Sequence, residues 1–199
     1  MRKLRFLLWL AALVVATGTA QAGPCPDATA AERRGVVNIA RWHYIASMMA
    51  IEHQAVSECW GYPAHCSEDA IRIINILNLV KSYEGWSEVG HLNSFVNQAI
   101  RSGTPSKEDW PDPFSIVLEG KGDCKSYATL KYFLLLELGF SKRDLDLLIV
   151  TDGDDQHLHM VVRVWMDDQW WILNNLNNTI PLATDYLKYH FIVQVFGDT

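Results

Sequence analysis

Apolar residues recur at helical spacing over the first half of the chain and in short β-rich runs over the second half. The helical spacing predicts helices at residues 28–57, 67–81 and 88–101. A fourth helix, at residues 123–139, is apolar on nearly every side, which is typical of a helix buried in a core. Between the third and fourth helices, the segment SGTPSKEDWPDP holds three prolines and no apolar period, so it is predicted to be a loop.

The pattern changes after Gly139. Four short segments are rich in β-branched and aromatic residues, namely LDLLIVT, HLHMVVRVWM, QWWILNN and FIVQVF. Asp167-Asp168 lies between the middle two and is predicted to be a two-residue hairpin turn. Helices followed by an antiparallel sheet indicate an α+β fold, in which the buried helix packs on the sheet.

The N-terminus has the three parts of a secretory signal peptide. Residues 1–5 are basic, residues 6–16 are an apolar run, and Ala20-Gln21-Ala22 is a small-x-small cleavage site. The apolar run is too short for a bilayer span, which needs about 20 residues, so a retained anchor is the weaker interpretation. We therefore expect residues 1–22 to be removed and residues 23–199 to form one periplasmic or secreted domain without membrane insertion.

Composition limits the partners of this chain. The formal net charge is −6 and 49% of the residues are apolar, so the chain can bury a core but has no basic footprint. We expect no nucleic-acid partner, because binding to phosphates needs clustered positive charge. The oligomeric state is left open by the sequence.

The chain has four cysteines, and an even number in an exported protein usually indicates disulfides. Cys59 and Cys66 flank the turn-rich stretch WGYPAH and are the natural local pair. Cys25 could instead pair with either of them. Cys124 has two interpretations: it is half of a bridge, or it is a free thiol and the one bridge uses two of the other three cysteines.

The position of Cys124 favours a nucleophile. It follows the predicted N-cap Asp123 and falls in the first turn of the buried helix. The partial positive charge of a helix N-terminus lowers the pKa of a thiol and favours the thiolate. The free N–H groups of the same turn can hold an oxyanion.

A cysteine nucleophile needs a base, and the predicted hairpin supplies one with an orienting partner. If Asp167-Asp168 is the turn, Met166 pairs with Gln169, and counting back along both strands pairs Val161 with Asn174. His159 then lies one diagonal step from Asn174 on the same face, within side-chain reach. These positions predict a Cys124–His159–Asn174 triad whose third member is an amide.

Two alternatives involve the same segment. A three-residue turn would change the parity of the strand and bring Asn175 to the histidine instead. A metal site is the other alternative, because DGDDQHLH clusters several ligand types: Asp152, Asp154, Asp155, His157 and His159. The stretch lacks the spacing and the terminal Glu of an EF-hand, and a plain acidic loop is the simpler interpretation.

Several short motifs resemble the transglutaminase-like cysteine peptidases of bacteria. WPDP, GKGDC, the tyrosine three residues after the cysteine, LKY and LG are similar to the region around that family's nucleophile. HMVV and LNN resemble its histidine strand and its acidic strand. Asn93 and Asn97, in LNSFVNQAI, resemble its paired asparagines. The similarity covers roughly residues 86–196.

The resemblance implies a papain-like fold, with a cysteine-bearing helix packed on an antiparallel sheet, and a periplasmic cysteine peptidase. The best-understood members clip large cell-surface adhesins and so control biofilm release. By motif, Cys124 corresponds to the nucleophile and His159 to the base. Asn174 stands where the family usually has Asp, and an amide can still orient an imidazole.

A second departure from the family concerns calcium. Adhesin-clipping members carry acids just after the cysteine for calcium, whereas this chain has Lys125 and Ser126 there. We therefore expect no cofactor and no metal, with calcium disfavoured. Trp110 is the candidate second oxyanion donor, because its indole N–H only donates and its loop precedes the helix. The alternative is that Trp110 packs against the neighbouring prolines.

The sequence thus predicts a thiol hydrolase that cuts an extracytoplasmic protein. The same triad could act on another amide or pass an acyl group to an amine. A non-catalytic binding module with this fold is the alternative class, kept open by the changes at Asn174, Lys125 and Ser126.

Overall fold

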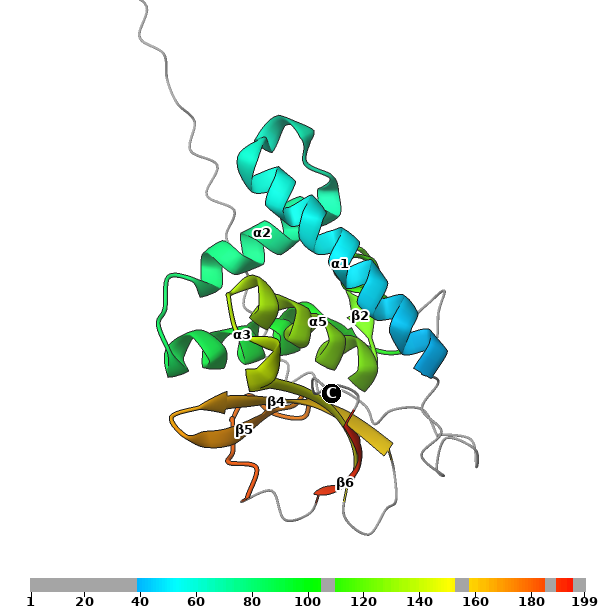
Figure 1. Ribbon diagram of the computed structural model, residues 1–199, viewed down its shortest axis with the longest axis vertical. Coiled ribbons are helices and arrows are strands. Elements are labelled where there is room, and N and C mark those ends of the chain that lie inside the picture. Colours follow the sequence, from blue (N-terminus) through cyan, green and yellow to red (C-terminus); the bar gives the residue numbers. More distant parts are fainter. Residues whose placement is uncertain (1–38, 105–109, 153–157, 185–188, 195–199) are drawn as a thin grey trace, which may run out of the picture.

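The computed structural model describes residues 39–104, 110–152, 158–184 and 189–194 (Figure 1). The helices are α1 (Ile39–Gly61), η2 (Pro63–His65), α2 (Glu68–Val80), α3 (Trp86–Ala99), α4 (Pro113–Glu119), α5 (Cys124–Glu137) and η3 (Lys142–Asp144). The strands are β1 (Arg101–Ser102), β2 (Lys121–Gly122), β3 (Leu145–Asp152), β4 (Leu158–Met166), β5 (Gln169–Leu173) and β6 (Tyr189–Gln194). The predicted signal peptide, Cys25 and His157 lie outside the described residues.

The helix ends follow the local sequence. Ser67 caps α2 by accepting the Ala70 N–H, and α5 ends before Gly139, whose φ of 96° is a conformation that glycine adopts without strain. Helix α4 was not predicted, although Asp112 at its N-cap and Pro113 in its first turn are a recognisable start signal.

Helix α5 lies at the centre of the molecule, as its apolar sequence predicts. It packs against β3 and β4 on one side and against α2, α3 and α4 on the other. In Figure 1 the sheet lies below α5, and α1 and α2 lie above it. A helix placed between two layers buries every face, which explains why α5 has no polar stripe.

The four-stranded sheet has the order β5-β4-β3-β6, and every neighbouring pair is antiparallel. The predicted hairpin between β4 and β5 is confirmed. Asp167 and Asp168 form the turn with φ values of 50° and 58°, and Met166 pairs with Gln169. Both turn residues thus have positive φ, which Asp tolerates better than most residues.

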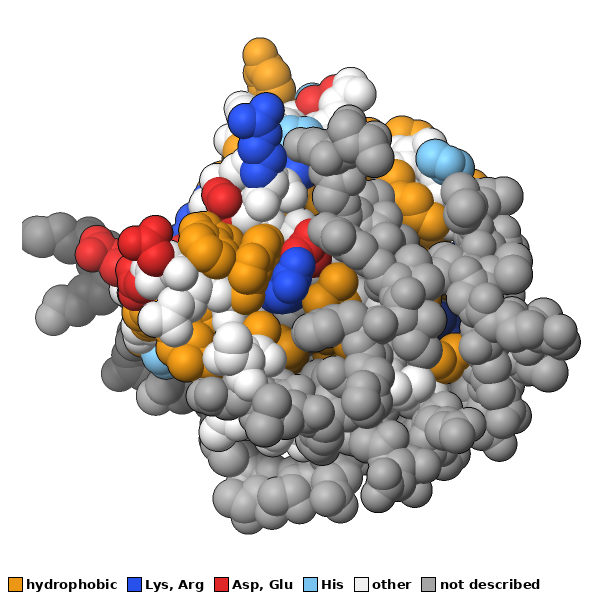
Figure 2. All heavy atoms as spheres, turned by 60° about the horizontal axis from the view of Figure 1, so that its bottom comes forward, with side chains coloured by type: hydrophobic (Ala, Val, Ile, Leu, Met, Phe, Trp, Pro, Cys, Tyr) orange, Lys and Arg blue, Asp and Glu red, His pale blue; other side chains and the backbone are white. Residues whose placement is uncertain are grey.

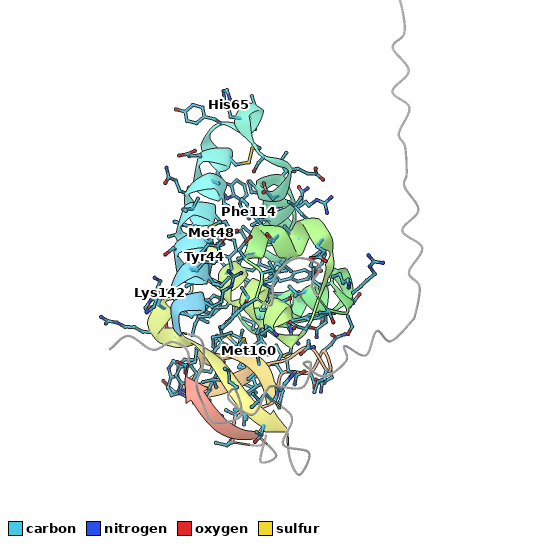
Figure 3. The ribbon with its side chains drawn as sticks, turned by 90° about the vertical axis from the view of Figure 1, so that its right-hand side faces the viewer. Tyr44, Met48, His65, Phe114, Lys142 and Met160 are labelled. Atoms are coloured by element: carbon cyan, nitrogen blue, oxygen red, sulfur yellow. A yellow bond between two sulfur atoms is a disulfide. The ribbon has the colours of Figure 1, made fainter. Side chains whose placement is uncertain are left out.

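The two faces of the sheet carry different apolar clusters. On the α5 side, Met160, Val162 and Val164 of β4 join the main core. Figure 3 shows Met160 where the sheet meets the helices. On the other side is a smaller cluster of four residues: Leu148, Val150, Val161 and Ile172. Successive strand residues therefore alternate between the two clusters.

A short parallel pair sets the start of α5. Arg101 pairs with Lys121 and Ser102 with Gly122, so β1, directly after α3, is joined to β2, directly before α5. This pairing explains why α3 ends two residues earlier than predicted: its last predicted residue, Arg101, is in a strand.

The described surface agrees with the charge of the sequence. On the face shown in Figure 2, the acidic and basic side chains of the described residues are scattered among apolar ones and form no basic patch. None of the described helices has the length and apolarity needed to cross a membrane.

Candidate active site

Cys124 is the first residue of α5 and is fully buried. The Asp123 side chain caps the helix, with Oδ1 accepting the backbone N–H groups of Lys125 at 3.0 Å and Ser126 at 3.3 Å. The Asp123 carbonyl accepts the Tyr127 N–H. The Asp123 residue thus takes the amides of the three residues after Cys124, and the partial positive charge of this helix N-terminus favours negative charge at the sulfur.

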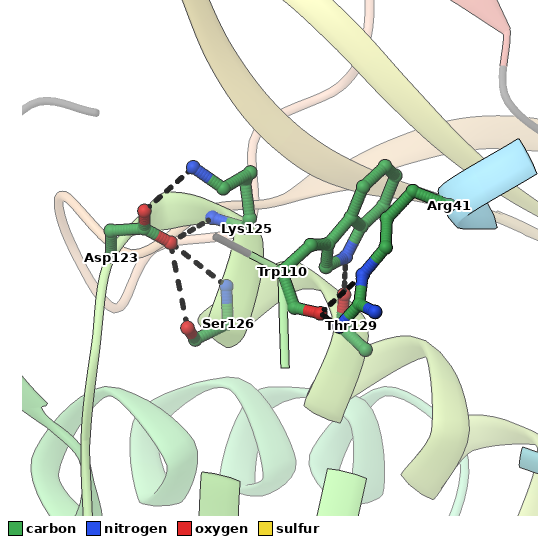
Figure 4. Close-up of polar contacts among 6 residues, drawn as sticks. All are labelled: Arg41, Trp110, Asp123, Lys125, Ser126 and Thr129. Carbon is green, nitrogen blue, oxygen red and sulfur yellow. Dashed lines mark hydrogen bonds and ion pairs between the residues drawn. The ribbon is translucent and has the colours of Figure 1, made fainter. Parts of the chain in front are cut away.

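Lys125 neutralises the capping carboxylate. Its Nζ lies 2.8 Å from Asp123 Oδ2, on the opposite side of the carboxyl group from the helix amides (Figure 4). Asp123 is buried, so its negative charge would otherwise act on the adjacent sulfur in a medium of low polarity. The ammonium group offsets the one effect in this turn that opposes a thiolate.

Gly122 is required by the close approach of the helix start. A Cβ placed on Gly122 would lie 2.3 Å from the Cβ of Ser126, which is itself fully buried. In the Gly-Asp-Cys sequence, glycine is needed because a larger residue would clash with Ser126, and aspartate is needed to cap the helix.

Cys124 is disulfide-bonded in this structure, and none of the cysteines among the described residues is free. Cys59 and Cys66 are bonded to each other, as predicted, so the partner of Cys124 is not among the described residues. A sulfur in a disulfide cannot attack a carbonyl. The structure therefore holds the oxidised state that the sequence offered as an alternative, and only the reduced protein could use Cys124 as a nucleophile.

His159 is the buried histidine of the described side chains. It lies in β4 opposite Val150, and its ring nitrogen Nε2 is buried without a hydrogen-bond partner in the described part of the chain. The remaining described histidines are exposed: His43, His53, His65 and His91. His65 lies at the α1–α2 turn, far from the sheet (Figure 3).

Strand alternation places His159 and Cys124 in different surroundings. His159 shares a face of the sheet with Val150 and Val161, which belong to the smaller cluster, whereas Cys124 belongs to the main core. The predicted contact between the sulfur and the imidazole stays a prediction. A test of the triad has to determine whether the His159 imidazole reaches the Cys124 sulfur from this face of β4.

Asn174 follows β5 directly and is buried. The register ends at the Val162–Leu173 pair, and one further step places Asn174 beside Val161, as the predicted turn requires. Its side-chain oxygen accepts the N–H groups of Leu176 at 2.9 Å and Asn177 at 3.1 Å. The oxygen thus closes a turn, and the other polar group of this side chain is an amide NH₂, which can only donate.

Asn175 is also buried, and neither its oxygen nor its nitrogen has a hydrogen-bond partner in the described part of the chain. Asn175 comes two residues after Leu173, which belongs to the main core, so alternation would place it on the face opposite to that of Asn174. The two-residue turn therefore favours Asn174 over Asn175 as the neighbour of His159 on its face.

The indole N–H of Trp110, the candidate oxyanion donor, makes a hydrogen bond inside the core. Its indole N–H donates to Thr129 Oγ1 on α5 at 2.8 Å, and its carbonyl accepts from the Arg41 guanidinium (Figure 4). Its ring packs against Trp42, with centroids 5.7 Å apart. The donor is used in a buried hydrogen bond, which favours the packing alternative, and the oxyanion role of Trp110 stays a prediction.

Two buried ionisable groups near α5 were not anticipated. Glu52 on α1 accepts the Phe114 N–H, and burial together with the neighbouring Asp112 raises the pKa of Glu52 to about 9. Lys131 on α5 is completely buried, and burial lowers its pKa well below the ordinary value. Neither was identified from the sequence, because the residue pattern does not tell which polar side chains of a helix are buried.

The alternative metal site falls largely in a part of the chain that the structure does not describe. Most of its candidate ligands, at residues 153–157, lie outside the described residues.

The fold and this site define a class: an α+β protein with a cysteine at the start of a central helix and a histidine on the adjoining antiparallel sheet. Residues 56–195 match the family described as bacterial transglutaminase-like cysteine proteinase BTLCP. Since the match covers well over half of the chain, the protein belongs to this family and is a cysteine peptidase by membership. None of the curated proteins matches the sequence.

Solved structures show the same fold. Legionella pneumophila LapG is similar with a TM-score of 0.50 and 23% identity, over 64% of this chain and 84% of that one. Calcium-bound LapG from the same organism has a TM-score of 0.48 and 23% identity, over 60% of this chain and 81% of that one. At 23% identity, the likeness with a TM-score of 0.50 supports the fold alone.

Proposed function

We propose that this protein is an exported cysteine peptidase that cleaves an extracytoplasmic protein with Cys124 as nucleophile, His159 as base and Asn174 as the group that orients the imidazole. The observation that carries the proposal is Cys124 at the first residue of a capped, buried helix within a peptidase family. The sulfur must first be released from its disulfide.

The proposed reaction follows from the groups in these roles. The Cys124 thiol gives its proton to His159, and the thiolate attacks the scissile carbonyl carbon. The oxyanion that forms is stabilised by the helix N-terminus, including the Cys124 N–H. Collapse breaks the C–N bond as His159 protonates the leaving amine, leaving a thioester. Water, deprotonated by His159, then hydrolyses the thioester and restores the thiol.

The proposed peptidase does not depend on calcium. Lys125 Nζ lies 2.8 Å from Asp123, so a fixed ammonium group occupies the place beside this carboxylate where a cation would be attracted. Binding Ca²⁺ there would require displacing a covalently attached positive charge and would leave few oxygen ligands, because Ca²⁺ takes six to eight. We therefore expect activity to survive chelation.

A non-catalytic binding module is the second candidate, and the disulfide on Cys124 is the observation that favours it. In that case Cys124 is a structural half-cystine, and the buried His159 serves packing. The same fold would then bind an extracytoplasmic protein without cleaving it.

The experiment that separates the two uses protein produced from residue 23 onward, with and without a mild thiol reductant. After reduction, a peptidase should be labelled at Cys124 by iodoacetamide at neutral pH and should cleave proteins of the source envelope fraction. Cys124→Ala should abolish cleavage, and Cys59→Ala with Cys66→Ala is the matched control for loss of the other bridge. No cleavage by reduced wild-type protein would reject the peptidase, whereas incorporation of an added amine would indicate acyl transfer.

A further inference from the structure

A completely buried lysine connects the helix that begins at Cys124 to the loop that follows β5. Lys131 lies seven residues after Cys124, two turns further along α5. Its Nζ donates to Asn97 Oδ1 at 2.6 Å and to the backbone oxygen of Asn174 at 2.7 Å. Two acceptors match the two N–H groups of a neutral amine, which is the form that burial favours.

Asn97 on α3 completes the connection. Its Nδ2 donates to the backbone oxygens of Asn174 at 3.0 Å and Asn177 at 2.9 Å, and to Asn178 Oδ1 at 3.1 Å. The amine of Lys131 and the amide of Asn97 therefore meet at one carbonyl, that of Asn174. The loop is held from α3 and from α5 at the same point.

The arrangement is costly for stability alone. An amine removed from water loses free energy that hydrogen bonds only partly restore, whereas a methionine of similar length would fill the same space without that cost. Unlike the packing of a methionine, the hydrogen bonds of Lys131 form only at particular distances and angles. They fix the backbone of the residue whose side chain is the candidate orienting group, and the Asn174 side chain is itself fixed by the turn to Leu176 and Asn177.

We propose that Lys131 is a positioning residue for the peptidase reaction: together with Asn97 it fixes the Asn174 backbone against α5 and so sets where the Asn174 amide stands relative to the helix of Cys124. The catalytic half of this inference rests on the proposed function. The structural half, anchoring of the loop at Asn174, does not depend on any activity.

The test compares three variants of the reduced enzyme. Lys131→Met and Asn97→Ala remove the anchor from its two ends. Tyr127→Phe is the matched control, because Tyr127 is on the same helix as Lys131 and its buried hydroxyl donates to the carbonyl of Ile100, at the end of α3. The substitution removes this hydroxyl and keeps the ring, whose centroid is 6.0 Å from Lys131 Nζ. We expect kcat to fall about 10- to 100-fold in both anchor variants with KM within about threefold of wild type, since misplacing a catalytic group affects the reaction more than binding.

Hydrogen exchange gives a readout that needs no activity. The amides of Leu176 and Asn177 should exchange about tenfold faster in both anchor variants and at the wild-type rate in Tyr127→Phe. If the exchange rates of these amides are unchanged in Lys131→Met and Asn97→Ala, the proposal is overturned. It is also overturned if exchange is faster in these variants but their kcat equals that of Tyr127→Phe. If wild-type protein cleaves nothing, the proposed function fails, while the exchange rates still decide whether Lys131 anchors Asn174.

Discussion

The buried carboxyl of Glu52 makes a quantitative prediction about stability and pH. Glu52 is 2% exposed, and its pKa is raised from 4.5 to about 9, first by burial and then by Asp112. Burial alone would raise the pKa of Asp112 too, but interactions with Glu52 and Ser115 hold it below its ordinary value. The proton of this pair therefore resides on Glu52.

Stability should decrease as the pH rises, because the two states bind the Glu52 proton with different affinity. The folded state holds the Glu52 proton more tightly than the unfolded state, so this stabilisation is fully present below about pH 4.5 and is lost as the pH rises to about 9. Each pKa unit corresponds to about 1.4 kcal/mol, so up to about 3 kcal/mol of it is already lost at pH 7. Glu52→Gln keeps the shape and the neutral charge but cannot ionise when the chain unfolds.

The assay is urea unfolding at pH 5, 6, 7 and 8 with the disulfides intact. The free energy of unfolding of Glu52→Gln, relative to wild type, should rise by up to about 1.4 kcal/mol per pH unit across this range. Glu58→Gln, at an exposed glutamate on the same helix, is the control and should give a constant difference. Parallel curves for Glu52→Gln and wild type would refute the assignment of a protonated Glu52.

Three further predictions test the surroundings of α5. Gly122→Ala should destabilise the fold by about 1–3 kcal/mol in thermal unfolding, because its Cβ would meet Ser126 at 2.3 Å, and Ser126→Gly in the same chain should restore most of the loss. Trp110→Phe should cost about 1–3 kcal/mol by leaving Thr129 without its donor, with kcat near normal; a kcat loss of about 10²-fold would instead restore the oxyanion role. Wild-type peptidase activity should persist in EGTA, whereas the activity of Lys125→Ala should depend on added calcium. Loss of wild-type activity in EGTA would contradict the role of Lys125.

Local sequence rules accounted for the elements that depend on near neighbours. The two-residue Asp167-Asp168 turn sets the β4–β5 register, and Asp123 sets the start of α5, because caps and tight turns are made within a few residues. The Cys59–Cys66 bridge, across seven residues, was predicted for the same reason. Helix α4 was missed because it is short and follows a proline-rich loop.

Contacts between distant residues could not be predicted in the same way. Lys131 finds its acceptors 34 and 43 positions away, and Trp110 finds Thr129 19 positions away, so their roles depend on how α5 packs against other elements. An apolar pattern identifies α5 as buried but does not tell which polar groups are buried with it. The placement of His159 relative to Cys124 is a question of this second kind.

Within the described residues, the chain passes from the helices to the four-stranded sheet once, through residues 140–144. The proposed nucleophile therefore belongs to the part of the protein that a ribosome makes first, and the proposed base and Asn174 to the part made last. A chain whose synthesis stops at this crossing contains Cys124 but neither His159 nor Asn174. On the proposed roles, such a fragment lacks the groups that activate the thiol, so only a chain that extends through β5 would cleave other proteins.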